Sequence, residues 1–362
     1  MLARSVIVVA VAVYAVIAGC SIMRTPGTPP AAQAEAQPVA RVSDEAVRDG
    51  LPYRAVGIQI QRVDWIDKYM EAIDEIADLG ADTVKIVVDA RQENGSSNRI
   101  YLDMRRTPTP EHLQRLIRHA KARGLRVILM PIVLLDAPRG REWRGTLKPE
   151  SWPDWFESYR EILTHFGWIA QGTGVDVLVV GSELVSSEGR VDDWRRTIND
   201  VRKVFTGKLT YSSNWDRYHA VPFWDQLDLI GMNSYWKLGD GPEATPEEIA
   251  RNWKSIQGDL LPFVQKQQKP LIFLEVGWCS MSNAAHEPWD YTTGDPIDLA
   301  LQQRLYEGFF EAWHGTPELG GFSIWEWTVG EGGPDDRTYT PEGKPAEETL
   351  RTWLAKPAWG VK

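Results

Sequence analysis

Cysteine is scarce in this chain of 362 residues, which contains only Cys20 and Cys279. So few thiols exclude a disulfide scaffold, and Cys279 is expected to be a buried free thiol. Positive charge is also limited, since 40 Lys and Arg face 50 Asp and Glu. The resulting formal net charge of -10 argues against nucleic acid as a partner.

Several signatures of chemistry are missing as well. The six histidines show no metal-ligand spacing, and neither a catalytic-triad motif nor a phosphate-binding glycine loop occurs. No metal and no other cofactor is therefore expected. Tryptophan is the abundant residue, with 17 copies against 11 Tyr and 9 Phe. Most tryptophans pack in cores, but their flat faces also stack on the apolar faces of sugar rings.

The first twenty residues have the pattern of an export signal. Arg4 precedes an apolar run at 6–17, which is shorter than the roughly 20 residues needed to cross a bilayer. The run ends in Ile17-Ala18-Gly19-Cys20, which resembles a bacterial lipobox with Cys20 as the lipidated residue. A plain secretory signal or an uncleaved anchor is the alternative. An acylated Cys20 would anchor the protein to a membrane and could not pair with Cys279.

Residues 21–50 are rich in Pro, Ala, Gln and Glu and lack apolar periodicity, so they are expected to form a flexible tether. Ser21 follows the predicted lipidation site. If the organism is Gram-negative, this residue favours sorting to the outer membrane or the cell surface. The folded domain is then expected at 51–362.

Short β-rich runs alternate with amphipathic helical windows throughout that domain. The runs predict strands at 56–60, 83–88, 126–133, 175–181, 209–213, 229–233, 271–274 and 321–324, and the windows predict helices at 66–79, 110–123, 153–170, 191–205, 246–268, 297–314 and 345–355. Eight repeats predict a single (β/α)₈ barrel with its chemistry at the carboxyl ends of the strands. A doubly wound open sheet is the alternative, but no strand is followed by a phosphate-binding glycine loop.

Two of the predicted strands end in a glutamate, Glu183 after the fourth and Glu275 after the seventh. Side-chain alternation would place Glu183 on the face of Val179, and Glu275 on the face of Phe273. If both faces point inward, the carboxylates meet at the barrel mouth, as retaining glycoside hydrolysis requires. The alternative is that each glutamate pairs with a nearby Arg or Lys.

The chain resembles glycoside hydrolase clan A, and more narrowly family 113, whose known members are β-mannanases. The resemblance covers nearly all of 53–355 and is carried by Trp143-Arg144-Gly145-Thr146-Leu147-Lys148-Pro149, Gly181-Ser182-Glu183-Leu184-Val185-Ser186, Glu275-Val276-Gly277-Trp278, Pro288-Trp289-Asp290-Tyr291 and the tail at 339–346. It implies that Glu183 is the acid/base and Glu275 the nucleophile. It also implies that Tyr235 orients the nucleophile and that the substrate is a β-glycan of the β-1,4-mannan type.

A further set of residues is expected to bind the substrate, although ordinary core packing is the alternative for each aromatic member. The set comprises Ser182, Trp325, Asn214, Trp215, Trp143, Arg144, Trp236 and Trp278. Ser182 stands where the clan usually has an asparagine for the sugar 2-hydroxyl, and Trp325 resembles the floor beneath the reacting sugar. Two alternatives stay open, namely the same chemistry on a different β-glycan and a catalytically silent surface protein that binds glycans.

Two charged residues near the predicted site have no assigned role. Lys85 lies within the second strand and is expected to bind a carboxylate or a sugar hydroxyl. Glu326 follows Trp325, and alternation would point it to the other face, where it would form a structural ion pair.

Overall fold

A computed structural model describes residues 50–293 and 295–356 of the chain. The predicted signal at 1–20, its Cys20 and nearly all of the predicted tether at 21–50 lie outside the described residues. Among the described residues, no helix is both long and apolar enough to cross a membrane.

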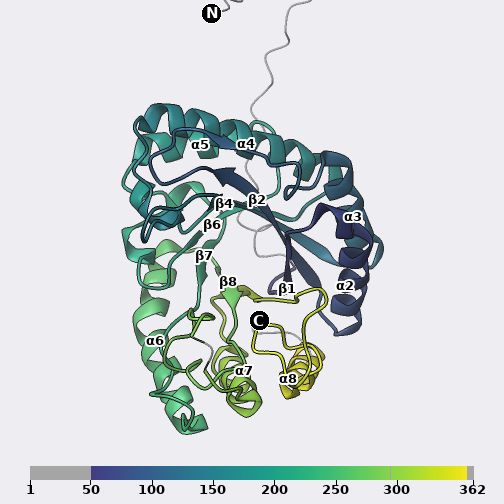
Figure 1. Ribbon diagram of the computed structural model, residues 1–362. Coiled ribbons are helices and arrows are strands. Elements are labelled where there is room, and N and C mark those ends of the chain that lie inside the picture. Colours follow the sequence, from purple (N-terminus) through teal and green to yellow (C-terminus); the bar gives the residue numbers. More distant parts are fainter. Residues whose placement is uncertain (1–49, 294, 357–362) are drawn as a thin grey trace, which may run out of the picture. The chain divides into compact units, whose positions relative to one another are not determined.

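Eight parallel strands form a closed barrel with helices packed around it (Figure 1). The strands are β1 (Tyr53–Ile60), β2 (Thr83–Gln92), β4 (Arg126–Leu135), β5 (Val177–Ser182), β6 (Lys208–Ser213), β7 (Ile230–Asn233), β8 (Leu271–Val276) and β9 (Leu319–Ile324). Each strand pairs with its neighbours in order, and β1 pairs with both β9 and β2, which closes the ring. The predicted (β/α)₈ barrel is confirmed, and the open sheet is excluded.

The helices on the outside are α2 (Ile66–Asp78), α3 (Pro110–Ala122), α4 (Trp152–Thr173), α5 (Val191–Arg202), α6 (Pro246–Gln267), α7 (Leu299–Trp313) and α8 (Pro345–Leu354). All seven predicted windows are helical. Several helices begin at a hydroxyl cap followed by proline, and the Thr109 side chain accepts a hydrogen bond from the backbone of His112. Between β6 and β7 the chain is too short for a full helix, and it contains only the short turns η4 (Tyr218–Ala220) and η5 (Trp224–Gln226).

One strand was not predicted. β3 (Ile100–Tyr101) pairs antiparallel with the end of β2, where Arg91 faces Tyr101. Two residues are too few to show an alternating pattern, so the sequence offers no signal for it. This hairpin lies beside the first turns of α4. There the Ser158 hydroxyl accepts a hydrogen bond from the amide of Ile100 and donates one to its carbonyl.

The hydrophobic core has two layers. A small inner cluster fills the barrel, with members such as Val87, Met130, Val179 and Ile272, while a larger outer cluster joins the strands to the helices. At the carboxyl ends of the strands, members of this inner cluster such as Val87 and Ile132 lie beside polar side chains in the wall of a cavity. Cys279 is buried near the barrel mouth, and burial raises the pKa of its thiol to about 12.

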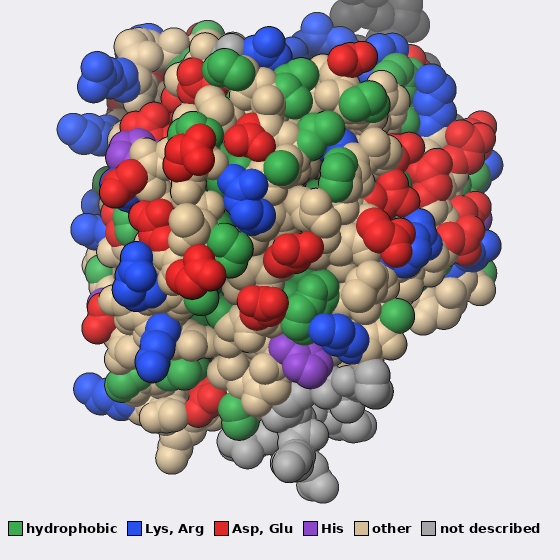
Figure 2. Space-filling model, turned by 90° about the horizontal axis from the view of Figure 1, so that it is seen from below, with side chains coloured by type: hydrophobic (Ala, Val, Ile, Leu, Met, Phe, Trp, Pro, Cys, Tyr) green, Lys and Arg blue, Asp and Glu red, His purple; other side chains and the backbone are tan. Residues whose placement is uncertain are grey.

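One face of the surface mixes both charges. Figure 2 shows acidic and basic side chains interspersed over it, with hydrophobic side chains scattered between them. Such scattered apolar groups are ordinary on a globular protein.

Candidate active site

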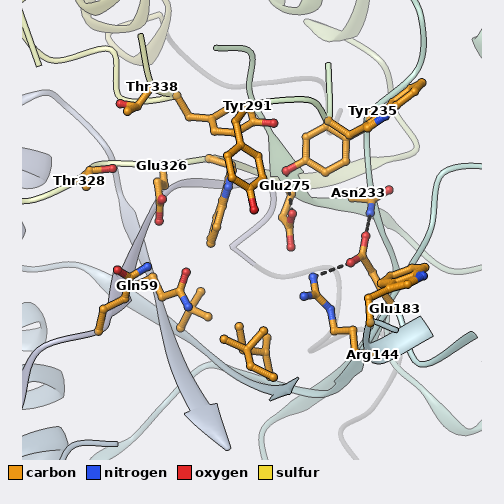
Figure 3. A pocket seen from close by; sticks show the side chains of 18 of the residues that line it. Gln59, Arg144, Glu183, Asn233, Tyr235, Glu275, Tyr291, Glu326, Thr328 and Thr338 are labelled. Atoms are coloured by element: carbon orange, nitrogen blue, oxygen red, sulfur yellow. Dashed lines mark hydrogen bonds and ion pairs between the residues drawn. The ribbon is translucent and has the colours of Figure 1, made fainter. Parts of the chain in front are cut away.

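A cavity of about 780 Å³ opens at the carboxyl ends of the barrel strands. Its wall includes Glu183 from the end of β5, Glu275 from β8 and Trp325 from the end of β9. Its volume lies in the usual range for binding sites of small organic ligands. Figure 3 shows the two glutamates on its wall, with Gln59 and Glu326 on the side away from Glu183.

Glu183 lies directly beyond β5 in a left-handed backbone conformation with φ of 54°. Residues other than glycine rarely adopt this conformation, and such positions cluster at functional sites. Its backbone amide donates a hydrogen bond of 2.8 Å to the carbonyl of Ser212 on β6, and this bond holds the backbone in that conformation. The strand end thus holds the carboxyl group at the barrel mouth.

Two donors hold the Glu183 carboxylate. Arg144 Nη2 lies 2.5 Å from Oε2, and Asn233 Nδ2 donates to Oε1. Burial raises the pKa of Glu183, the Arg144 guanidinium opposes that rise, and the negative charge of Glu275 adds to it. The net direction is upward, so this carboxyl keeps its proton to a higher pH than an exposed glutamate does.

Glu275 has a different environment. The phenol of Tyr235 donates a hydrogen bond of 2.7 Å to Oε2 of Glu275, and both side chains are buried. Burial and the adjacent Glu275 charge raise the pKa of Tyr235 well above its ordinary value, so the phenol stays a donor. A carboxylate that accepts from a neutral donor is held in one orientation and remains able to attack an electrophile.

The alternation argument for Glu275 is wrong, although the side chain does reach the cavity. Phe273 belongs to the outer core, whereas Leu274 belongs to the inner cluster and Glu275 lines the cavity. Two successive side chains therefore face inward. The pairing of β8 with β7 slips here, so that Met232 pairs with Phe273 but the next residue, Asn233, pairs with Glu275.

A similar irregularity lies in β5. Val179 faces the barrel interior, but the position of a Cβ on Gly181 would meet the outer-core rings of Trp194 and Tyr211. The β5–β6 register shifts between Val179 and Ser182. Bulges of this kind near active sites redirect side chains, and period-two reasoning cannot anticipate them.

A fully buried cation lies against the indole of Trp325, which lines the cavity. Lys85 on β2 is fully buried, its Nζ donates to the carbonyl of Leu274, and it lies 4.5 Å from the centre of the Trp325 ring. Burial lowers the pKa of Lys85 to about 8, against the opposing influence of Glu275. Lys85 thus holds the backbone next to Glu275, which is neither of the two contacts expected for it.

Glu326 lines the same cavity, so the expectation that it points away from Trp325 is wrong. β9 ends at Ile324, and strict alternation does not extend beyond a strand. Burial raises the pKa of Glu326 to about 7, an effect that the Lys85 charge opposes. A third carboxyl group therefore stands in the cavity beside Glu275.

Several aromatic side chains also line the cavity. Trp215 and Trp289 stack with ring centres 6.3 Å apart and planes inclined by 14°. Tyr291 and Trp143 also line the cavity and are 68% and 39% exposed. Exposed aromatic faces of this size suit contact with the apolar faces of a sugar chain.

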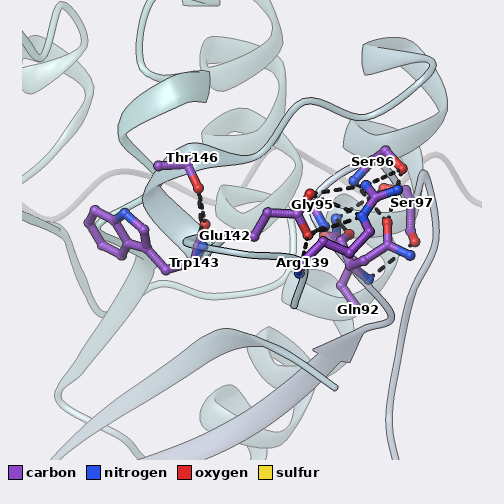
Figure 4. Close-up of polar contacts among 9 residues, drawn as sticks. Gln92, Gly95, Ser96, Ser97, Arg139, Glu142, Trp143 and Thr146 are labelled. Carbon is purple, nitrogen blue, oxygen red and sulfur yellow. Dashed lines mark hydrogen bonds and ion pairs between the residues drawn. The ribbon is translucent and has the colours of Figure 1, made fainter. Parts of the chain in front are cut away.

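The long loop after β4 carries Trp143 and Arg144, and a polar network braces it (Figure 4). Arg139 donates 2.8 Å to Ser96 Oγ and pairs with Glu142 at 3.0 Å, while Glu142 accepts 3.1 Å from the amide of Gly95. These contacts tie the loop to the segment that follows β2, so Arg144 is held in place by structure outside the cavity.

Most of the predicted site residues meet in this cavity. Those that line it are Glu183, Glu275, Tyr235, Trp325, Asn214, Trp215, Trp143 and Arg144. Ser182, Trp236 and Trp278 do not.

Trp278 is wrong as a sugar platform because it is fully buried, with its ring 5.1 Å from that of Tyr306 in an edge contact. Trp236 packs behind Trp215 and against Trp253, so it supports the wall without lining it. Ser182 is also wrong as a substrate contact, since its side chain is buried within the β5–β6 pairing.

Sequence reasoning missed several residues of the cavity. Asn233 is the most consequential, because it bonds Glu183 and its Oδ1 accepts 2.8 Å from the amide of Trp215. Its position at the end of β7, where the chemistry of a barrel is expected, was the sequence feature that could have identified it. Trp289 and Tyr291 were part of the recognised motif but received no role, and Gln59 on β1 gave no signal at all.

Within 50–293 and 295–356, no three His, Cys, Asp or Glu side chains come together in a way that could hold a metal ion. The two buried carboxyl groups with defined partners, Glu183 and Glu275, are the candidates for catalysis. One is biased toward its protonated form, and the other is oriented by a phenol. Together they can deliver a proton and a nucleophile to one bond.

Comparison with known proteins gives a consistent result. The model of Glycoside Hydrolase Family 113 matches residues 55–344. Among solved structures, a GH113 β-1,4-mannanase is 26% identical with a TM-score of 0.77, covering 84% of this chain and 98% of that one. The GH113 β-mannanase AaManA from Alicyclobacillus acidocaldarius is 28% identical with a TM-score of 0.76, covering 85% of this chain and 99% of that one.

More distant structures share the fold alone. A β-glucuronidase from Faecalibacterium prausnitzii is 13% identical with a TM-score of 0.59, and the match covers 86% of this chain and 50% of that one. No curated protein sequence matches the chain.

Proposed function

Because the chain belongs to glycoside hydrolase family 113 and is a glycoside hydrolase, we propose that it cleaves β-1,4-mannan-type chains with retention of anomeric configuration. Glu183 is the acid/base, and Glu275 is the nucleophile. The observation that carries the proposal is the contrast between these carboxyl groups in one cavity. Glu183 has a raised pKa, whereas Glu275 is held by Tyr235.

In the first step, the protonated carboxyl of Glu183 donates its proton to the glycosidic oxygen. A carboxylate oxygen of Glu275 attacks the anomeric carbon, the bond to the leaving oxygen breaks, and a glycosyl ester forms on Glu275. Asn233 and Arg144 hold the Glu183 carboxyl group in one orientation, because each contacts one of its oxygens.

In the second step, Glu183 acts as a base. It removes a proton from a water molecule, whose oxygen attacks the anomeric carbon and displaces Glu275. The enzyme regains its starting protonation state. Two displacements at one carbon leave the configuration of the product the same as that of the substrate.

The substrate class rests on similarity to the β-1,4-mannanases and on the aromatic side chains that line the cavity. A different β-glycan is the second candidate. It is favoured by the apolar side chains of Ile132 and Leu134 in the β4 wall, and by the burial of Ser182 where a polar contact to the 2-hydroxyl was expected. Both observations concern the polar contacts that distinguish one sugar from another.

The test measures reducing-sugar release by the purified protein from a panel of β-glycans, with Glu275→Gln as the control. Release from mannan or glucomannan that the control lacks supports the proposal. Release from another glycan alone moves the assignment to the second candidate. Release that persists in Glu275→Gln contradicts the mechanism.

The proposal includes the location of the enzyme. Cys20 carries a lipid that anchors the domain to a membrane through the tether at 21–50, at the outer membrane or cell surface in a Gram-negative cell. Labelled palmitate should enter the parent protein and be absent from Cys20→Ala in the native host. Equal labelling of both proteins would contradict this assignment.

A further inference from the structure

A buried carboxyl group that the proposed mechanism does not use follows Glu183 closely in the chain. Glu188 is 2% exposed, and among the described residues its Oε2 has no hydrogen-bond partner. Its Oε1 accepts 2.9 Å from the phenol of Tyr211 on β6. Burial raises the pKa of Glu188 to about 7, and the hydrogen bond from Tyr211 opposes that rise. A carboxyl group is costly to bury in this way, so a role for it is worth seeking.

The phenol of Tyr211 has a second contact, with the backbone directly beyond Glu183. The amide of Leu184 donates 2.9 Å to the hydroxyl oxygen of Tyr211. Leu184 is 1% exposed, and within the described part of the chain no backbone carbonyl accepts from its amide. Because the single phenol proton goes to Glu188, the lone pairs of the Tyr211 oxygen are left to face the Leu184 amide. The phenol therefore keeps a buried donor paired.

Two neighbouring residues of β6 hold the two successive amides at this strand end. The amide of Glu183 donates to the carbonyl of Ser212, and the amide of Leu184 donates to the side chain of Tyr211. The peptide groups before and after Glu183 are thus both held, at the residue whose φ is 54°. A residue other than glycine keeps this conformation only where its surroundings impose it.

The rest of the turn brings Glu188 back to Tyr211. The carbonyl of Leu184 accepts 2.7 Å from Ser187 Oγ and 2.9 Å from the Ser187 amide, which closes the short turn η3 (Val185–Ser187). The indole of Trp194 on α5 donates 3.1 Å to the carbonyl of Ser187. These bonds fix the backbone that carries Glu188, so its carboxyl group is in place to accept the phenol proton.

We infer that Tyr211 and Glu188 are positioning residues for the acid/base Glu183. Tyr211 holds the amide that follows Glu183, and Glu188 holds the phenol of Tyr211 in the orientation that this contact needs. Neither side chain lines the cavity, so both act on the reaction through Glu183. The inference rests on the proposed function and deepens it, because it assigns the support of the acid to a pair outside the cavity.

The test compares Tyr211→Phe with the parent on two substrates. On mannan the leaving oxygen needs the proton of Glu183, whereas β-mannobiosyl fluoride forms the glycosyl ester without one. A displaced acid should lower kcat on mannan by about 10-fold, with little change in KM. The rate of fluoride release in the first turnover should change by less than about twofold, because that step does not use the acid.

Tyr159→Phe is the matched control. Tyr159 on α4 is also buried, and its phenol donates 2.8 Å to the carbonyl of Val180 on β5, away from the turn at Glu183. Each variant removes one buried hydrogen bond to the backbone, so both should lower the midpoint of thermal unfolding. Only Tyr211→Phe should lower kcat on mannan. Equal losses of kcat in the two variants would overturn the inference, as would an equal loss of Tyr211→Phe on both substrates.

A second pair of variants carries the test without changing Tyr211, and decides it if Tyr211→Phe does not fold. Glu188→Gln keeps an oxygen that accepts from the phenol and should retain mannan turnover within about threefold, whereas Glu188→Ala should lose about 10-fold. Equal turnover by these two variants would contradict the role of Glu188. A parent that acts on neither mannan nor the fluoride would contradict the proposed function itself. An active parent with unaffected variants would contradict this inference alone.

Discussion

Glu183 and Glu275 are buried to a similar degree in the cavity but are held by different partners. Glu183 contacts the guanidinium of Arg144, in the loop after β4, and the side-chain amide of Asn233, at the end of β7. Glu275 accepts from one phenol and stands beside a backbone carbonyl that Lys85 holds. Burial alone therefore does not distinguish the two carboxyl groups, whereas their partners do, and the proposed roles rest on that difference.

The largest effect is expected at the nucleophile. Glu275→Gln keeps the shape and the hydrogen bond from Tyr235 but removes the attacking charge, so turnover should fall by at least about 10⁴-fold. Steady-state kinetics on mannan would measure this, with circular dichroism as the control for folding. Activity within tenfold of the parent would remove Glu275 from the role.

The acid should show a dependence on the substrate that the nucleophile lacks. Glu183→Gln should lose about 10²–10⁴-fold on mannan, where the leaving oxygen needs a proton. On β-mannobiosyl fluoride the loss in formation of the glycosyl ester should be far smaller, because fluoride leaves without one. Pre-steady-state fluoride release would measure that step, and equal losses on both substrates would argue against the acid assignment.

Tyr235→Phe removes the phenol that donates to Glu275 without changing the charge of that carboxylate. The reduction in kcat should be about 10²-fold, comparable to the loss of one pre-organised donor, with little change in KM. Tyr306→Phe, which changes a fully buried phenol that does not line the cavity, serves as the control. Similar losses in both variants would indicate a general packing effect.

Arg144→Met tests how the charge of Arg144 sets the pKa of Glu183. The guanidinium opposes the rise in the pKa of Glu183, so its removal should let that pKa rise further. The acid then stays protonated to higher pH, and the basic limb of the kcat/KM profile should move upward in pH. Arg141→Met, which removes an exposed cation from the same loop without touching the polar network that braces it, should leave the limb in place. A limb that moves downward would contradict the sign.

The smallest effect is expected at Ser182. Its buried hydroxyl has no hydrogen-bond partner among the described residues, so Ser182→Ala should be close to neutral in stability and change kcat/KM by less than about twofold. Thermal unfolding and mannan kinetics would measure both. A loss of tenfold or more would restore Ser182 as a contact for the sugar.

The barrel was predictable from the sequence because short apolar runs alternate with amphipathic helical windows, which is a local pattern. The positions of Glu183 and Glu275 at strand ends were predictable for the same reason. The orientation of Glu275 was not, since the slip in pairing between β7 and β8 depends on the neighbouring strand. Trp278 illustrates the opposite error, because adjacency to a site residue does not show which side of the chain its ring occupies.

Partners that come from distant segments were also beyond the reach of the sequence. Asn233 and Arg144 meet at Glu183 from different strand ends, and Lys85 reaches the backbone of Leu274 across the barrel. Only the closure of the barrel brings such groups together. The resemblance to a family supplied the roles, whereas the contacts that explain those roles required the fold.

The most direct test of the account is to trap the glycosyl ester. A mannosyl fluoride substituted with fluorine at C2 slows the second step, and intact-mass spectrometry followed by peptide mapping locates the label. The account predicts one glycosyl unit on the peptide that contains Glu275 and no label on Glu275→Gln. A label on another residue, or an inverted product with no trapped intermediate, would contradict it.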